Sequence, residues 1–318
     1  MNLNLNRFAS IALLASLWML PGCQSSGNAQ EPEVNQPADD TPDTASLPDV
    51  DAPDYWDDAE LVWSDEFDGD ALDTEKWRFE TGAHGWGNNE WQNYVEDGVT
   101  EVSEGTLKIT ARKVGSGGNA GDYESARLNS RQDFTYGRLE IRARIPEHKG
   151  NGIWPALWML GSNIGTVGWP HCGEIDIMEY VSFEPDQMHF SIHSSANNHM
   201  NGTQITSGPV PLETVEEEFH VYGVLWTSKY LKFYLDDPAN VELIFRRPIP
   251  TTAENWPFSQ PFYFLMNIAV GGNWAGSKGW MTASSRLPWR WIMCGFTRCR
   301  EATAEYPREK CPTSSKCE

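Results

Sequence analysis

The sequence predicts an all-β fold, an antiparallel sandwich or barrel, from three observations. Short runs of alternating apolar and polar residues recur with turn signals between them, and few segments have helical spacing. The alternation is strict at 138–144, where Leu139, Ile141 and Ala143 share one face and charged residues occupy the other. Fifteen tryptophans and 27 glycines among 318 residues suit a β-rich protein with an aromatic-lined surface. We therefore expect one large all-β domain with tails.

The folded part is expected to begin near Leu61, followed by a turn and a short helical piece at 70–77. A loop rich in glycine and asparagine at 84–94 leads into a strand. No internal repeat is found. Further strands are expected at 106–111, 127–131, 138–144, 152–160, 174–180, 188–193, 220–226, 231–235 and 261–270.

Residues 1–23 resemble the export signal of a bacterial lipoprotein. A basic start precedes a short apolar run, and Leu-Pro-Gly-Cys ends at Cys23, the expected lipidation site. The run is too short to span a bilayer comfortably. The resemblance implies an exported protein that is lipid-anchored at the cell envelope, and Gln24 favours the outer membrane. An ordinary cleaved signal with an incidental cysteine is the alternative.

Residues 24–58 are rich in Pro, Asp, Ser and Ala and contain no Lys or Arg. Such composition predicts a disordered, acidic linker that holds the folded domain away from a membrane. The formal net charge of −21 argues against nucleic acid or an anionic membrane as partner. We expect membrane contact only through the lipid anchor, and a monomeric protein.

The segment 172–180, Cys-Gly-Glu-Ile-Asp-Ile-Met-Glu-Tyr, carries three acids within six residues. On a strand, Glu174 and Asp176 share one face, while Ile175 points to the other. A β-bulge at Met178 would bring Glu179 to the face of the first two acids. A solvated strand face is the plain alternative, but crowded like charges beside tryptophans favour a functional site.

Trp154 and Trp158 lie four residues apart, so in a strand they also share a face. Indole faces can bind the C–H surfaces of sugar rings, although tryptophans in a sheet are also common in the core. Pro155 between them favours a rim position over a regular central strand.

Several segments together resemble glycoside hydrolase family 16, specifically its laminarinase-like branch. They cover roughly 63–276 in the order and spacing of that family. The carrying segments are 63–69, 85–92, 125–130, 134–146, 150–160, 169–180 and 265–274.

The resemblance implies a jelly-roll β-sandwich (concanavalin A-like) with an open substrate cleft on its concave sheet, formed by 59–277. It also implies a retaining double displacement on β-1,3-glucan, which uses two carboxyls about 5–5.5 Å apart. By position Glu174 is the nucleophile and Glu179 the acid and base. Asp176 lies between them and influences their protonation, because clustered carboxyls cannot all ionise readily.

The same resemblance implies substrate contacts for a second set of residues. The segment 194–207 departs from the branch, which leaves substrate choice open there. The reaction requires no cofactor, and no trustworthy metal-ligand spacing is found among His148, His199 and His220. The residues implied to contact the glucan are Asn89, Arg127, Trp154, Trp158 and His193.

Residues 278–318 lack the strand with which the family ends. Read one base earlier, the codons of 280–282 must contribute Asp-Asp, and those of 291–295 permit Asp-Tyr-Val-Arg, as the family ending has. We therefore hypothesise a frameshift, real or a sequencing error, shortly before Gly279, which leaves an out-of-frame, disordered tail. The family's structural calcium ion uses an Asp of that strand, so calcium is doubtful here. A disulfide framework among the tail cysteines is the alternative.

Four functions follow from these observations. The first is an endo-β-1,3-glucanase, and the second is another family-16 β-glycanase that acts on mixed-linkage glucan or an algal galactan. The third is a non-catalytic glucan-binding protein, which the presence of both Glu174 and Glu179 disfavours. The fourth is an inactive product of the frameshift.

Overall fold

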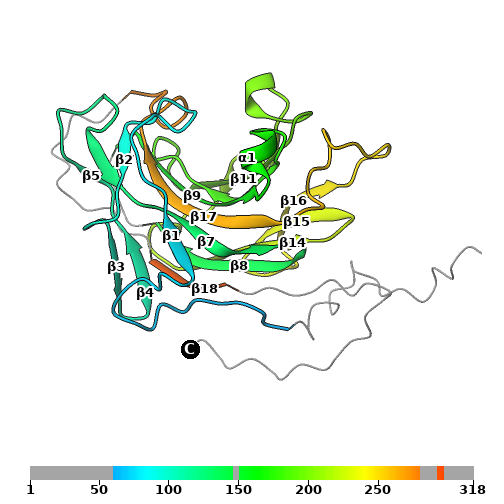
Figure 1. Ribbon diagram of the computed structural model, residues 1–318, viewed down its shortest axis with the longest axis horizontal. Helices are drawn as coiled ribbons and strands as arrows, with labels where there is room; N and C mark the ends of the chain where they lie inside the picture. Colours follow the sequence, from blue (N-terminus) through cyan, green and yellow to red (C-terminus); the bar gives the residue numbers. More distant parts are fainter. Residues whose placement is uncertain (1–59, 146–149, 280–291, 297–318) are drawn as a thin grey trace, which may run out of the picture. The chain divides into compact units, whose positions relative to one another are not determined.

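Two antiparallel β-sheets stack face to face in the computed structural model, which describes residues 60–145, 150–279 and 292–296 (Figure 1). All of these residues belong to one compact unit, 47–318. The first sheet runs β1-β7-β17-β9-β10-β11-β12, and β13 also pairs with β11. Its strands are β1 (Trp77–Phe79), β7 (Arg127–Phe134), β17 (Phe262–Val270), β9 (Ile153–Gly161), β10 (Glu174–Glu179), β11 (Gln187–His193), β12 (Ile205–Thr206) and β13 (Val210–Pro211).

The second sheet runs β16-β15-β14-β8-β18-β4-β3, and a small third sheet runs β2-β6-β5. The helical pieces are α1 (Ile164–Val167) and the 3-10 turn η2 (His199–Asn201). The strands of these two sheets are β16 (Val241–Arg246), β15 (Tyr230–Leu235), β14 (His220–Trp226), β8 (Gly137–Arg144), β18 (Ile292–Phe296), β4 (Thr106–Ile109), β3 (Thr100–Ser103), β2 (Gln92–Tyr94), β6 (Tyr123–Ser125) and β5 (Arg112–Lys113).

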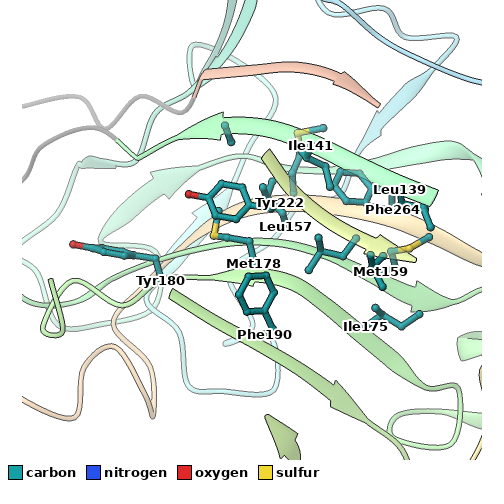
Figure 2. Packing of buried hydrophobic residues seen from close by; sticks show 14 of the residues in the cluster. Leu139, Ile141, Leu157, Met159, Ile175, Met178, Tyr180, Phe190, Tyr222 and Phe264 are labelled. Atoms are coloured by element: carbon teal, nitrogen blue, oxygen red, sulfur yellow. The ribbon is translucent and has the colours of Figure 1, made fainter. Parts of the chain in front are cut away.

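The hydrophobic core lies between the two large sheets (Figure 2). Alternation on β8 places Leu139 and Ile141 in it, as the sequence predicts, and both are fully buried. Across from them, Met159 of β9 and Ile175 of β10 point into the same core. Removal of this much apolar surface from water is the main term that holds the sheets together. The expected jelly-roll β-sandwich is confirmed.

Because one face of the first sheet packs into the core, only its opposite face can bind a ligand. Residues that alternate with the core residues on β9 and β10 point away from the second sheet. We call this the site face. The long strand β17 curves so that its concave side faces away from the second sheet (Figure 1).

A β-bulge interrupts β10, as the sequence predicts, with its extra residue one position before the expected Met178. Asp176 pairs with Trp158 of β9 and Met178 pairs with the next residue, Leu157, so Ile177 is the extra residue. Ile177 and Met178 are both fully buried in the core. Two successive inward side chains reverse the alternation, so Glu179 returns to the site face.

The structure differs from the sequence-based expectations at three places. Pro155 was expected to favour a rim position, but β9 lies between β17 and β10 inside the first sheet. Residues 74–76 form one turn, in which the Trp77 amide donates to the Asp73 carbonyl over 2.9 Å, and β1 begins at Trp77 where a helical piece was expected. In addition, β18 forms between β8 and β4, although no strand was expected after Gly276. Strand pairing uses backbone groups, so the place between β8 and β4 can be filled without an alternating sequence.

The other expectations for the chain ends, including the lipidation of Cys23, the signal at 1–23 and the linker at 24–58, lie outside the described residues. No helix in the described ranges is both long and apolar enough to cross a membrane.

Candidate active site

Glu174, Asp176 and Glu179 lie on the site face of β10, between strands β9 and β11. In the antiparallel register of β10 and β11, Glu174 lies opposite His193 and Glu179 lies opposite His189. Asp176 and Glu179 are buried, and the Glu174 side chain is 17% exposed. The local bulge and the central position of β10 therefore gather three carboxyls in a poorly solvated place.

Glu174 is held by a residue close in sequence. Nε1 of Trp169 donates a hydrogen bond to Glu174 Oε2 over 3.0 Å. Burial raises the pKa of Glu174 to about 7, while this hydrogen bond and the positive charge of Arg127 oppose the rise. The two opposing contacts favour the ionised form of Glu174.

Oε1 of Glu179 accepts a hydrogen bond from Nε1 of Trp154 over 3.1 Å. Burial raises the pKa of Glu179 to about 8, and repulsion from Glu174 adds to the rise. The two glutamates thus differ in environment, and Glu179 keeps its proton when Glu174 has lost its own.

Asp176 lies between the two glutamates and has its pKa raised well above the ordinary value, by burial and then by repulsion from Glu174 and Glu179. His193 Nε2 lies 3.4 Å from Asp176 Oδ2 and 3.7 Å from Glu174 Oε1. Burial and the neighbouring His199 lower the pKa of His193 to about 3, so its imidazole is neutral at ordinary pH.

Arg127 is sandwiched between two indoles. Its guanidinium carbon lies 4.7 Å from the ring centres of both Trp86 and Trp158, and its Nε donates to Glu80. Nε1 of Trp158 in turn donates to Asn267 on β17 over 2.8 Å. Cation–π contact and the ion pair together fix a positive charge near Glu174.

Trp154 and Trp158 both lie half-buried on the site face of β9, as their spacing predicts. Trp154 also meets Trp274 edge to face, with ring centres 5.2 Å apart. The ring of His189 lies 5.1 Å from Trp274, and its Nε2 lies 3.1 Å from Glu184 Oε2. An aromatic wall defined by Trp154, His189 and Trp274 therefore stands beside Glu179.

Asn89 lies apart from the acids. It is exposed, and its Nδ2 donates to Asn273 Oδ1 over 2.9 Å. Because Trp274 follows Asn273, this bond ties the loop of Asn89 to the aromatic wall. Asn89 has a φ of 55°, a left-handed conformation that asparagine tolerates better than most residues.

The structure thus brings together Glu174, Asp176, Glu179, Arg127, Trp154, Trp158 and His193, and joins Asn89 to their margin. Sequence reasoning gave no role to several side chains that contact them. Trp169 and Trp274 lay within the motif segments 169–180 and 265–274, which was the available signal. Trp86 and Asn267 likewise lay within the motif segments 85–92 and 265–274, whereas Glu80, His189 and His199 had no local signal.

The residues of this chain do not fit the calcium ion that the fold family implies. The expected carboxylate donor belongs to the final strand, and residues 280–300 contain no Asp or Glu. We therefore derive no step through calcium.

Two carboxyls with different proton affinities on one face are the requirement for acid-assisted displacement at a glycosidic carbon. Buried, neutral His193 and the indole N–H groups can orient them without added charge. Aromatic rings at both ends of the acid row provide flat apolar surfaces of the kind that sugar rings bind.

Comparison with known proteins agrees with this chemistry. The family model for glycosyl hydrolases family 16 matches residues 87–292. A β-glucanase of Rhodothermus marinus is 45% identical over 229 residues, which is 69% of this chain and 78% of that protein.

Two solved structures are also similar. The laminarinase of Rhodothermus marinus has a TM-score of 0.69 and 41% identity, covering 76% of this chain and 97% of that one. A laminarinase from Flavobacterium sp. UMI-01 has a TM-score of 0.67 and 39% identity, covering 76% of this chain and 100% of that one. With the family model matched over most of the described domain, the chain belongs to glycosyl hydrolase family 16.

Proposed function

We propose that the protein is a retaining, endo-acting glycoside hydrolase that cleaves β-1,3-glucan bound across the site face. The observation that carries the proposal is that two carboxyls on one bulged strand have different electrostatic environments. Both glutamates accept a hydrogen bond from an indole, but the positive charge of Arg127 favours ionised Glu174, whereas the repulsion of Glu174 disfavours ionised Glu179. Family membership and similarity to laminarinases of known structure support the substrate class.

In the first step, neutral Glu179 donates its proton to the glycosidic oxygen while a carboxylate oxygen of Glu174 attacks the anomeric carbon. The carbon–oxygen bond to the leaving sugar breaks, and a covalent glycosyl ester forms on Glu174. In the second step, ionised Glu179 removes a proton from water, whose oxygen displaces Glu174 from the same carbon. Two inversions restore the original configuration and both carboxyls.

Asp176 assists by position. Its raised pKa keeps it neutral when Glu174 is charged, so the row of three acids holds no more negative charge than the displacement needs. The aromatic wall of Trp154, His189 and Trp274 stands on the side of Glu179, where the leaving sugar departs. The sandwiched Arg127 lowers the cost of the charge on Glu174.

The test is a reducing-sugar assay on laminarin, with lichenan and agarose alongside. We expect wild-type protein to release oligosaccharides from laminarin, and proton NMR to show the β-anomer first. Glu174→Gln and Glu179→Gln should lose hydrolysis while keeping the wild-type near-ultraviolet circular dichroism. Glu124→Gln, at a surface ion pair with Arg112, is the matched control. Wild-type rates in either active-site variant would refute the assignment.

The alternatives appear as different outcomes of the same assay. Preference for lichenan or agarose would indicate another β-glycanase of the family. Binding of laminarin without product, by a protein with native circular dichroism, would indicate a glucan-binding protein.

We also propose that the protein is exported and held at the cell envelope, in the outer membrane, through a lipid on Cys23. The Leu-Pro-Gly-Cys run supports this placement. Fractionation of cells that express wild type or Cys23→Ser tests it. Wild type should sediment with outer membranes and the variant should not, and equal membrane association of both would contradict the proposal.

The frameshift before Gly279 remains a proposal about the gene. The codons that permit Asp-Tyr-Val-Arg in the other frame are those of 291–295, and β18 spans Ile292–Phe296. The two segments overlap, which supports the view that the place between β8 and β4 is filled by a strand in either reading frame. Resequencing tests the gene, and comparison of thermal unfolding with a frame-corrected chain measures what the altered residues cost.

A further inference from the structure

Three side chains from neighbouring strands each bring a potential metal-ligand atom to within 4.8 Å of the other two. They are Glu174 and Asp176 of β10 and His193 of β11, and we call them the donor triad. Within the described ranges this is the one such group. The two strands pair with Glu174 opposite His193, so sheet register holds the triad together.

The spacing of the donor triad suits a small tetrahedral ion. Zn²⁺ bonds of about 2.0–2.2 Å to nitrogen and carboxylate oxygen place tetrahedral ligand atoms about 3.3–3.6 Å apart. Nε2 of His193 lies 3.4 Å from Asp176 Oδ2 and 3.7 Å from Glu174 Oε1. The first distance lies within that range and the second about 0.1 Å above it, and all three donor atoms lie within 4.8 Å of one another.

One donor atom lacks a partner. Oδ2 of Asp176 is buried and has no hydrogen-bond partner among the described residues, and the residue as a whole is 3% exposed. A buried oxygen without a donor is costly, and a cation bound there would remove that cost. In Glu174 one oxygen already has a partner, because Trp169 donates a hydrogen bond to Oε2. The other oxygen, Oε1, lies toward His193.

The donor set also discriminates between metals. One imidazole with two carboxylates suits Zn²⁺, whereas Mg²⁺ and Ca²⁺ require about six or more oxygen ligands. The Glu174 side chain is 17% exposed, against 7% for His193 and 4% for Asp176. The fourth position of the ion is therefore reached from the Glu174 side, where water can occupy it.

We propose that Glu174, Asp176 and His193 form a Zn²⁺-binding site whose occupation excludes glucan and blocks the nucleophile. A carboxylate oxygen of Glu174 that donates an electron pair to the ion is a weaker nucleophile toward an anomeric carbon. Zn²⁺ is thus a reversible inhibitor that competes with the polysaccharide. The competition with glucan rests on the proposed function, while binding of the ion does not.

Isothermal titration calorimetry with ZnCl₂ tests the site directly. The full chain carries Glu179→Gln, which removes hydrolysis and leaves the donor triad intact. Thiolates elsewhere must be excluded as ligands, so five cysteines are replaced by serine: Cys23, Cys294, Cys299, Cys311 and Cys317. We expect one Zn²⁺ per chain, no comparable binding of MgCl₂ or CaCl₂, and weaker Zn²⁺ binding when a laminarin oligosaccharide is present.

Further substitutions in the same background locate the ion. His193→Gln and Asp176→Asn should each weaken Zn²⁺ binding by at least about tenfold. His220→Gln is the matched control, because His220 Nδ1 lies 2.9 Å from Asp236 Oδ2 on the second sheet, away from the triad. It should leave binding unchanged.

Three results would overturn the proposal. They are Zn²⁺ affinity that survives both triad substitutions, equal binding of Mg²⁺, and loss of binding in His220→Gln alone. Zn²⁺ binding that oligosaccharide does not weaken would retain the metal site and refute competition with glucan. Binding of Zn²⁺ by a protein that hydrolyses no glucan would separate failure of the proposed function from failure of this inference.

Discussion

Trp169 donates a hydrogen bond from its indole nitrogen to Glu174 Oε2 over 3.0 Å, from the loop between α1 and β10. This contact lowers the proton affinity of the proposed nucleophile against the effect of burial. The indole of Trp169 also packs against His199, which comes from a different loop. The ring of His199 lies 5.1 Å from Trp169 and 5.3 Å from His193.

His199 is therefore expected to act as a positioning residue through Trp169. Its loop is anchored by Asn198, which is buried and donates to the carbonyls of Ser194 and Ser195. His199→Ala should lower kcat by about 2–10-fold, the effect of one weakened hydrogen bond, with little change in KM. The acidic limb of the pH profile should move upward, because Glu174 loses part of its stabilising contact.

Two variants accompany this measurement. His199→Phe should restore most of kcat, because it keeps a ring against Trp169. Met200→Ala, at the next and largely exposed position, should behave as wild type. An effect of His199→Ala on KM alone would assign the residue to sugar binding.

The pH dependence of kcat/KM should be bell-shaped and displaced from ordinary carboxyl values. The active form has ionised Glu174 and neutral Glu179, whose pKa values are raised to about 7 and about 8. Activity should rise as pH passes about 7 and fall as it passes about 8. Initial rates on laminarin between pH 4 and 10 measure this, and limbs near 4.5, the ordinary pKa of a glutamate, would contradict it.

Removal of the sandwiched cation should raise the proton affinity of the nucleophile. Arg127 lowers the pKa of Glu174, so Arg127→Met should shift the acidic limb to higher pH and reduce kcat/KM at pH 6 by about 10–100-fold. Arg127→Lys keeps the charge and should shift the limb less. Arg112→Met, which breaks a surface pair with Glu124, should leave the limb in place.

The burial of Glu179 should cost stability at alkaline pH. Its pKa in the folded state, about 8, exceeds the ordinary value of 4.5, so the folded protein binds this proton more tightly. Below 4.5 both states hold the proton. Stability then falls as pH rises toward 8, because only the unfolded state gains by ionising.

Glu179→Gln removes this penalty. The variant should match wild type in unfolding free energy at pH 4 and exceed it by about 1–3 kcal/mol at pH 9. Urea unfolding at both pH values measures the difference, with Glu124→Gln as a control that shows none. A variant no more stable than wild type at pH 9 would indicate that Glu179 ionises freely in the fold.

Local pattern explains how much of the site the sequence could predict. Alternation with period two depends only on neighbouring residues, so it placed Leu139 in the core and Trp154 beside Trp158 on one face. The acid spacing likewise implied a bulge, which the structure has at Ile177. The family resemblance supplied the order of the segments, and family membership is now established.

Contacts between distant segments explain what the sequence left unassigned. Arg127 and Glu80 are 47 residues apart, and Trp158 and Asn267 are 109 apart. Such pairs depend on how β7, β17 and β9 align in the first sheet, which no short pattern encodes. The same limit applies to β18, where backbone groups of β8 and β4 provide a place for a segment without alternation.

By itself, therefore, the sequence determined the fold class, the core face and the three acids on one strand, because these follow from residue type and local period. Only the tertiary structure decided which donors reach each acid. Trp169, Trp154 and Arg127 give Glu174 and Glu179 different proton affinities. The physical reason is that burial and charge act through space, so their balance is set when the strands have assembled.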